Sequence, residues 1–196
     1  MSEVLHAKVT ESEKHGISRR SVVAGVAWSL PVIATAIAAP AAAASGYSAT
    51  AALVGQASNI TLVSSSGTGS GTNQTGKGPT GFQINNTGIA MTGVITGTVN
   101  IKPSGTVIAG AGIQSIGSAT LTAAVPAYTN AFEYNATFTY AGGVTSGQTL
   151  TFPLSFQYQR VTPAPSKTTY SYTLTITLRL PDGTDRIMAG IVTVAY

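Results

Sequence analysis

The clearest pattern in the sequence is an alternation of apolar and polar side chains with a period of two residues, which is typical of β-strands that bury one face. It runs through residues 131–140, 149–159 and 170–180. The opposite positions are mostly threonine, serine and glutamine, so we expect the aromatic residues to form a core rather than a ligand platform. The predicted inward positions are Phe132, Tyr134, Ala136, Phe138, Tyr140, Phe152, Leu154, Phe156, Tyr158, Tyr172, Leu174, Ile176, Leu178 and Leu180.

Shorter segments continue the strand pattern toward the N-terminus. They cover residues 47–54, 60–63, 82–84, 94–101 and 118–125. In the last of these segments Leu121, Ala123 and Val125 are predicted to point inward. Pro153 lacks the amide donor of a ladder hydrogen bond, so its strand is expected to lie at a sheet edge or to carry a bulge.

Turn signals separate these segments. In Leu180-Pro181-Asp182-Gly183-Thr184, proline sets the first corner and Gly183 takes a left-handed position, which predicts a tight hairpin. Residues 142–147 are predicted to close a second hairpin, and 85–88 to form a turn because Asn and Gly tolerate positive φ. The last hairpin's predicted register sets Leu180 opposite Thr184, Arg179 opposite Asp185, Ile176 opposite Met188 and Tyr172 opposite Val192.

Together these elements predict an all-β chain. We expect one antiparallel β-sandwich of roughly eight to ten strands over residues 45–196, which resembles immunoglobulin-like surface proteins in its general pattern. Residues 64–81 are rich in Gly, Ser and Thr and offer no apolar anchor, so we expect a mobile loop there.

The first 44 residues follow a different pattern. Paired arginines, Arg19 and Arg20, precede an apolar, alanine-rich run over residues 22–39. Small residues follow, with Ala42 and Ala44 placed for a peptidase that would cut before Ser45, and residues 36–38 offer an earlier option. This order predicts a signal peptide over 1–44 that inserts as a helix.

The motif Ser18-Arg19-Arg20-Ser21-Val22-Val23 resembles the twin-arginine (Tat) export signals of high-GC Gram-positive bacteria. The long polar lead over residues 1–16 and the mild apolar run are similar to that class as well. The resemblance implies export in a folded state, with the export machinery and a signal peptidase as partners. The Sec route and an uncleaved membrane anchor are the alternatives.

The composition of residues 45–196 restricts the chemistry. The chain has no cysteine, and both histidines, His6 and His15, lie before residue 45. The usual nucleophilic triads, zinc sites and copper sites therefore lack their ligands or bases, and we expect no cofactor or metal. A calcium site at Asp182 and Asp185 would need several more oxygen ligands. The acidic residues of this part are Glu133, Asp182 and Asp185, against six basic residues.

These observations favour a non-enzymatic protein, secreted or at the cell surface, with a structural or adhesive role. Its expected partners are further copies of itself, joined through strand edges, or cell-wall polysaccharide. A secreted carbohydrate- or wall-binding module is the alternative, for which Tyr47 or Tyr128 would have to be exposed. The net charge of +3 over residues 45–196 is scattered, so nucleic acid is not an expected partner, and the membrane is contacted only through the signal.

Overall fold

The computed structural model describes residues 47–65, 72–165 and 168–196. The predicted signal helix lies outside the described residues, together with Arg19, Arg20, Ala42, Ala44 and Ser45. In the described part, no helix is long and apolar enough to cross a membrane. Residues Tyr47–Tyr196 make up one compact unit.

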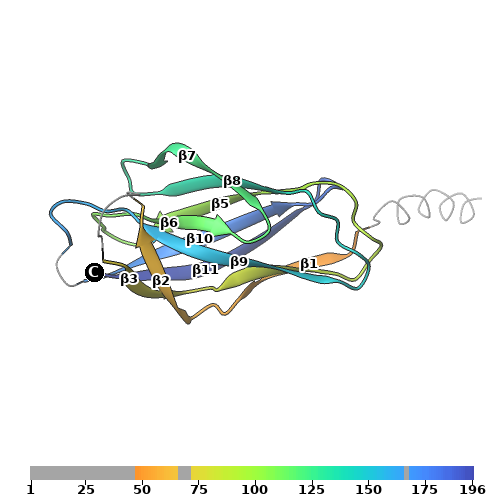
Figure 1. Cartoon of the computed structure of the whole chain (residues 1–196), viewed down its shortest axis with the longest axis horizontal. Helices are drawn as coiled ribbons and strands as arrows, with labels where there is room; N and C mark the ends of the chain where they lie inside the picture. The colour runs from red at the N-terminus through yellow and green to blue at the C-terminus, as the bar shows by residue number, and fades with distance from the viewer. Residues whose placement is uncertain (1–46, 66–71, 166–167) are drawn as a thin grey trace, which may run out of the picture. The chain divides into compact units, whose positions relative to one another are not determined.

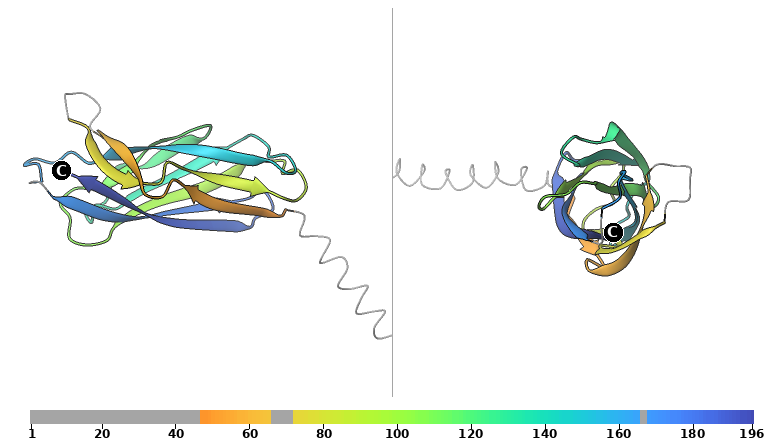
Figure 2. Two further views of the ribbon diagram at one scale, coloured as in Figure 1. Left: turned by 90° about the horizontal axis from the view of Figure 1, so that it is seen from below. Right: turned by 90° about the vertical axis from the view of Figure 1, so that its left-hand side faces the viewer.

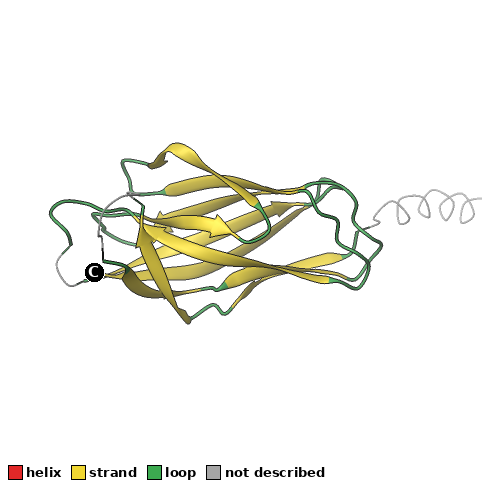
Figure 3. Cartoon of the chain, viewed as in Figure 1, coloured by secondary structure: helices red, strands yellow, loops and turns green. Residues whose placement is uncertain are grey.

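This unit is all-β, as the alternation predicted, and Figure 3 shows only strands and loops in the described residues. Figure 1 shows most of the strands running along the long direction of the unit. The described residues form eleven strands: β1 (Ala49–Val54), β2 (Ser58–Ser64), β3 (Gln74–Gly78), β4 (Gly81–Asn86), β5 (Ile95–Pro103), β6 (Ala111–Ile116), β7 (Thr120–Tyr128), β8 (Tyr134–Tyr140), β9 (Thr149–Tyr158), β10 (Thr169–Arg179) and β11 (Asp185–Ala195).

The strands form one continuous hydrogen-bonded path in the order β1-β4-β9-β2-β3-β11-β10-β5-β8-β7, and β6 pairs with β9. The expectation of a purely antiparallel arrangement is wrong at one place, because β2 runs parallel to β9 over Leu62–Ser64. The reason is that β4 pairs with β9 only as far as Pro153. The remaining half of β9 has an open side there, and β2 fills it.

The core lies between strands from the two ends of this path. The end-on view in Figure 2 shows the strands arranged around a common interior. Phe82 of β4 stacks on Phe152 of β9 at 4.7 Å between ring centroids, and it meets Phe138 of β8 at 5.7 Å. All three rings are buried. The aromatic alternation of β8 and β9 therefore forms a core, as predicted, except at Phe132, which lies before β8 with a φ of 61° and is only half-buried.

The C-terminal hairpin has the predicted register. Arg179 pairs with Asp185, Ile176 with Met188 and Tyr172 with Val192. The Leu180 amide donates to the Thr184 carbonyl, and Gly183 has a φ of 81°. A turn with one left-handed glycine thus sets eleven residue pairs along β10 and β11.

The mobile loop predicted for 64–81 is wrong over Gln74–Gly78, which forms β3 and pairs with β2. A strand that forms backbone hydrogen bonds needs no apolar side chains of its own, so the apolar pattern did not reveal it. Its two glycines instead allow close approach: a Cβ on Gly78 would meet the Ile60 side chain at 2.9 Å. Residues 66–71 of the predicted loop lie outside the described residues.

Two predictions for β7 and β8 are wrong. Val125, predicted to face inward, is 98% exposed, because the pairing of β7 with β8 is irregular between Ala123 and Tyr128. Residues 142–147 do not close a hairpin, since β8 pairs with β5 and β7 whereas β9 pairs with β4, β6 and β2. The segment instead carries the chain from one side of the core to the other.

Pro153 lies inside the sheet rather than at an edge. Its carbonyl accepts a hydrogen bond from the Gly117 amide, just beyond the end of β6. In an antiparallel ladder a residue's N–H and C=O point the same way. The side on which Pro153 lacks an N–H therefore faces Gly117, the residue after the end of β6. The pairing irregularity between β6 and β9 falls in β6, between Ile113 and Ser115.

Asn86 is buried at the end of β4 and has a negative φ. The turn predicted for 85–88 therefore does not depend on a positive φ at Asn86, but on the hydrogen bonds of its side chain. Its side-chain amide donates to the carbonyls of Ile89 (2.8 Å), Val144 (3.2 Å) and Thr145 (3.1 Å). Its Oδ1 accepts from the Gly88 amide at 3.1 Å. One side chain thus joins the β4–β5 and β8–β9 connections.

We predict that Asn86→Ala lowers the free energy of unfolding by about 1–3 kcal/mol, because buried carbonyls lose their donor. Urea denaturation monitored by tyrosine fluorescence measures the change. The matched control is Asn135→Ala, which removes a single half-buried hydrogen bond to Asn100 and is expected to cost less than about 1 kcal/mol. Equal losses in the two variants would contradict this role of Asn86.

Candidate functional site

An uncharged surface of the described residues lies on the outer side of five neighbouring strands, β11, β10, β5, β8 and β7. We call it the threonine face. Inward residues of the same strands, such as Leu174 and Ile176, are fully buried, so the alternation places the polar residues outside. The threonine face consists of Ile187, Ala189, Ile191, Thr173, Thr175, Thr177, Thr96, Thr98, Asn100, Asn135, Thr137, Thr139, Thr120, Thr122 and Ala124.

The strand registers align these side chains in rows across the face. Asn100 and Asn135 also form a side-chain hydrogen bond of 2.8 Å. The central row is Ala189, Thr175, Asn100 and Asn135, and the next row is Ile187, Thr177, Thr98, Thr137 and Thr122.

Ion pairs lie at the two ends of the threonine face. Lys102 pairs with Glu133 at 3.3 Å, and Arg179 pairs with Asp185 at 3.3 Å. Both pairs are partly exposed and contribute little to stability. Between them the face carries only hydroxyl, amide and alkyl groups, with a hollow of about 530 Å³ beside Ala123 and Ala136.

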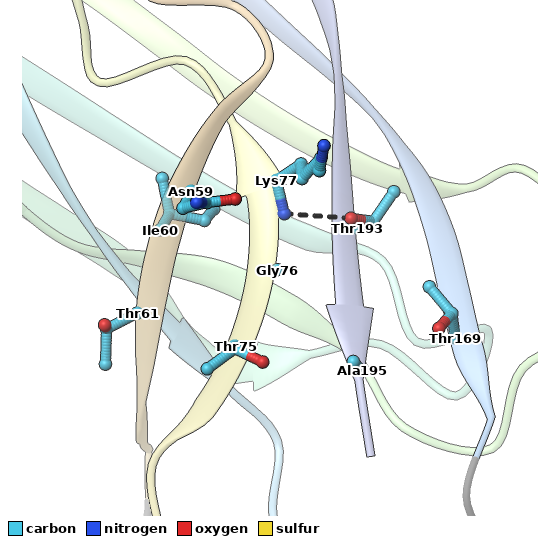
Figure 4. A pocket seen from close by; sticks show the side chains of 9 residues that line it. All are labelled: Asn59, Ile60, Thr61, Thr75, Gly76, Lys77, Thr169, Thr193 and Ala195. Atoms are coloured by element: carbon cyan, nitrogen blue, oxygen red, sulfur yellow. Dashed lines mark hydrogen bonds between the residues drawn. The ribbon is translucent and has the colours of Figure 1, made fainter.

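A second candidate is a groove of about 630 Å³ on the outer side of β2, β3, β11 and β10, which we call the hydroxyl groove (Figure 4). Six of its nine lining residues are polar, and one of these, Lys77, is a cation. The lining residues are Asn59, Ile60, Thr61, Thr75, Gly76, Lys77, Thr169, Thr193 and Ala195.

The hydroxyl groove follows the seam between β3 and β11. These strands share one residue pair, Thr75 with Ala195, and the Lys77 amide donates to the Thr193 hydroxyl at 2.9 Å. Gly76 lies so close to the Thr193 carbonyl that a Cβ would clash with it. A glycine is therefore required for the two backbones to meet at the floor of the groove.

The ammonium of Lys77 is not paired with any carboxylate of the described residues. Glu133 binds Lys102, and Asp185 binds Arg179. Asp182 accepts hydrogen bonds from the Thr184 amide and hydroxyl, at 2.9 and 2.7 Å, and these bonds lower the pKa of its carboxyl group.

The positions of the three acidic side chains bear on catalysis and metal binding. Asp182 and Asp185 flank the turn after β10, whereas Glu133 precedes β8 and pairs with β5. Within the described residues, no group of three or more His, Asp or Glu side chains is positioned to hold a metal ion. The two aspartates weighed for calcium are thus engaged with Thr184 and Arg179.

The strand edges differ in how they are covered. Arg186 donates to the Ala49 carbonyl at 2.7 Å and covers the edge of β1. The Tyr134 hydroxyl donates to the Ile113 carbonyl of β6 at 2.7 Å. β7 is the last strand of the path, and its edge contains Pro126 and the irregular register after Ala123, two features that limit strand addition.

Tyrosines gather inside one end of the unit. The sequence pattern did not reveal this cluster, because its members come from β7, β8, β9, β10 and the C-terminus. Tyr128 packs on Tyr134 at 5.7 Å, and Tyr196 packs on Tyr158 and Tyr170 at 5.7 and 5.5 Å. Neither Tyr47 nor Tyr128 is exposed. Burial raises the pKa of Tyr134 and of Tyr196 to about 12, and it raises the pKa of Tyr128 and Tyr172 further.

We predict that Gly76→Ala lowers the free energy of unfolding by about 1–3 kcal/mol, because the added methyl group pushes β3 away from Thr193. Urea denaturation measures the loss. Gly105→Ala is the control, since a Cβ there meets no atom within 4 Å. A Gly76→Ala variant as stable as the control would show that β3 and β11 do not need this close approach.

We also predict that alkaline pH destabilises the protein through the buried tyrosines. Because burial raises their pKa values in the folded state, the folded protein holds these protons more tightly than the unfolded chain, in which tyrosine titrates near about 10. Their contribution is complete below about pH 10 and is lost as the pH rises toward about 12. The urea midpoint across this range measures the effect, and Tyr196→Phe is expected to reduce the slope; an unchanged slope would contradict the prediction.

No family model matches this chain, and neither does any curated protein sequence. The function is therefore argued from the surfaces described above.

Proposed function

We propose that this chain is a non-enzymatic structural or adhesive protein that acts outside the cell, at the cell surface or in the surrounding matrix. The observation that carries the proposal is the threonine face, whose five strands present no charged side chain between the two ion pairs. The centres of protein interfaces are depleted of charged residues, because charges lose their hydration when they are buried.

The export part of the proposal rests on the sequence. Arg19 and Arg20, the apolar run and the small residues Ala42 and Ala44 before Ser45 have the order of a twin-arginine signal. The partners at this stage are the export machinery and a signal peptidase. The body that follows, with threonine-rich strands and few ionisable groups, suits an environment outside the cell.

We also propose that the fold is an immunoglobulin-like β-sandwich in the broad sense. In this reading β1, β4, β9 and β6 make one layer, and β11, β10, β5, β8 and β7 make the other. The hydrogen-bonded order of the strands and the contact of Phe82 with Phe138 across the core support it. The β2–β3 hairpin then links the two layers.

Two routes of self-association are available. Strand addition at β7 has a regular stretch over Thr120–Ala123, but Pro126 and the irregular register limit its length. Packing through the threonine face is not limited in this way. We therefore favour the face over the edge as the route of assembly.

A second function, binding of cell-wall polysaccharide, is favoured by the hydroxyl groove. Sugar hydroxyls pair with threonine hydroxyls and with the Asn59 amide, and Lys77 would bind a carboxylate on an acidic sugar. The groove volume of about 630 Å³ lies within the usual range for small-molecule sites. Stacking on exposed aromatic rings would not contribute, since Tyr47 and Tyr128 are not exposed.

The decisive experiment measures intact mass and hydrodynamic size of the native protein, taken separately from culture medium and from washed cells. We expect the mass of a chain that begins at Ser45, and we expect to find this chain in cell-bound assemblies. A full-length mass in the membrane fraction would contradict the cleaved signal. A protein that is strictly monomeric at high concentration and absent from the cell surface would overturn the structural role.

The wall-binding alternative has its own measurement, which is sedimentation of the protein with purified wall polysaccharide. If the hydroxyl groove binds an acidic sugar, Lys77→Ala will weaken binding and Lys102→Ala will leave it unchanged, because Lys102 is paired with Glu133. Equal binding by the two variants would exclude a role of this groove.

A further inference from the structure

An exposed apolar stripe runs along the outer side of β11, at the margin of the threonine face. Ile187 is 71% exposed and Ile191 is 61% exposed, with Ala189 between them. Their neighbours in sequence, Met188 and Val192, point into the core and are buried. Two isoleucines on one face of one strand lie about 14 Å apart. Such clustered apolar exposure indicates an interaction surface.

The order of side chains in the stripe is self-complementary. Read in either direction it is Ile, Ala, Ile, with Ala189 at the centre. A two-fold axis requires that residue i of one copy meets residue j of the other and that j meets i. The axis lies in the plane of contact between the two copies, passes over Ala189 and runs perpendicular to β11. It places Ile187 of one copy against Ile191 of the second copy.

The neighbouring strands fit the same axis. Thr175 lies beside Ala189, and Asn100 lies beside Thr175, so the axis follows the central row of the threonine face. Thr173 of one copy then meets Thr177 of the other. Threonine pairs across packed strands combine methyl contacts with hydroxyl hydrogen bonds.

Charge placement supports this arrangement. Rotation about the central row sets Arg179 against Ser171 and Asp185 against Thr193 of the second copy. On β5 it sets Lys102 against Thr98. No like charges therefore meet across the axis on these strands, and like charges in contact would oppose association.

The size of the threonine face is sufficient. Five strands about 4.8 Å apart and three outward rows about 6.8 Å apart make an area of roughly 24 Å by 20 Å, which includes the Lys102–Glu133 ion pair in the row of Ile191. Two such faces bury on the order of 1,000 Å² together, which is the lower limit for a specific interface. Sheets commonly pack in this way, about 10 Å apart with their strands nearly aligned.

We propose that the protein forms a two-fold dimer in which the threonine faces of two copies pack together, with Ile187 of each copy against Ile191 of the other. The proposal rests on the structural function proposed above and names its partner, a second copy, and its contact surface.

Paired charge variants test the axis directly. Ile187→Lys/Ile191→Lys brings like charges together across the axis, and we expect the dimer Kd to rise at least about 100-fold. Ile187→Lys/Ile191→Glu brings opposite charges together, so dimers should persist and weaken as salt is added. Sedimentation of the native protein and both variants over a range of concentrations measures the effect. Equal dimer Kd values for the two double variants would overturn the proposal.

The control substitution is Ile89→Lys. Ile89 is also 61% exposed, but it lies in the connection between β4 and β5 and outside the threonine face. We expect this variant to dimerise as the native protein does. If Ile89→Lys dissociates the dimer as strongly as Ile191→Lys does, the stripe is not the contact.

A cross-linking measurement is independent of the charge variants. The chain has no cysteine, so Ala189→Cys introduces a single thiol on the proposed axis. Faces about 10 Å apart are too distant for a disulfide but suit a short bismaleimide. We expect efficient cross-linking of Ala189→Cys and little of Ile89→Cys; the reverse would overturn the axis.

The outcomes separate this inference from the function on which it rests. Cell-bound assemblies that persist unchanged in Ile187→Lys/Ile191→Lys would exclude the stripe and leave the structural role intact. A native protein that stays monomeric and is absent from cells would exclude both. A monomer that binds wall polysaccharide, and loses that binding in the same double variant, would overturn the dimer and assign the face to a glycan.

Discussion

Burial of every second side chain along β5, β8, β10 and β11 is the constraint on which the rest of the structure depends. With no disulfide to support it, the fold relies on a core that includes Leu174, Ile176 and Phe138, all fully buried. The same alternation leaves the other side of each strand outside. Because the registers are regular, the outer side becomes an ordered array of threonines, so one constraint produces both the core and the threonine face.

Single polar groups tie strands and connections together at defined places. Asn86 joins two connections through three carbonyls, and Arg186 covers the edge of β1. The Tyr134 hydroxyl ties β8 to β6. Each of these groups pairs with a backbone carbonyl that would otherwise lose its hydrogen bond on burial. None of these contacts involves a residue of the threonine face or of the lining of the hydroxyl groove.

These two surfaces differ in the chemistry they offer. The threonine face is uncharged and ends in an apolar stripe at Ile187 and Ile191, which suits contact with another protein surface. The hydroxyl groove is concave and carries an unshared cation, which suits a smaller polar ligand. The groove and the stripe are adjacent on β11, and the proposed dimer sets Asp185 of one copy against Thr193, a groove residue, of the other.

The all-β class, the inward faces of β8, β9 and β10, and the register of the C-terminal hairpin followed from the sequence alone, because alternation and turn chemistry are local. The sequence did not determine β3, whose pairing needs only a backbone, or the place of Pro153, which depends on where β6 ends. Val125 was misplaced because a register irregularity lies in the pairing and not in the residues. The threonine face and the hydroxyl groove could be assigned only in the tertiary structure, since their side chains come from strands far apart in sequence and are aligned by long-range pairing.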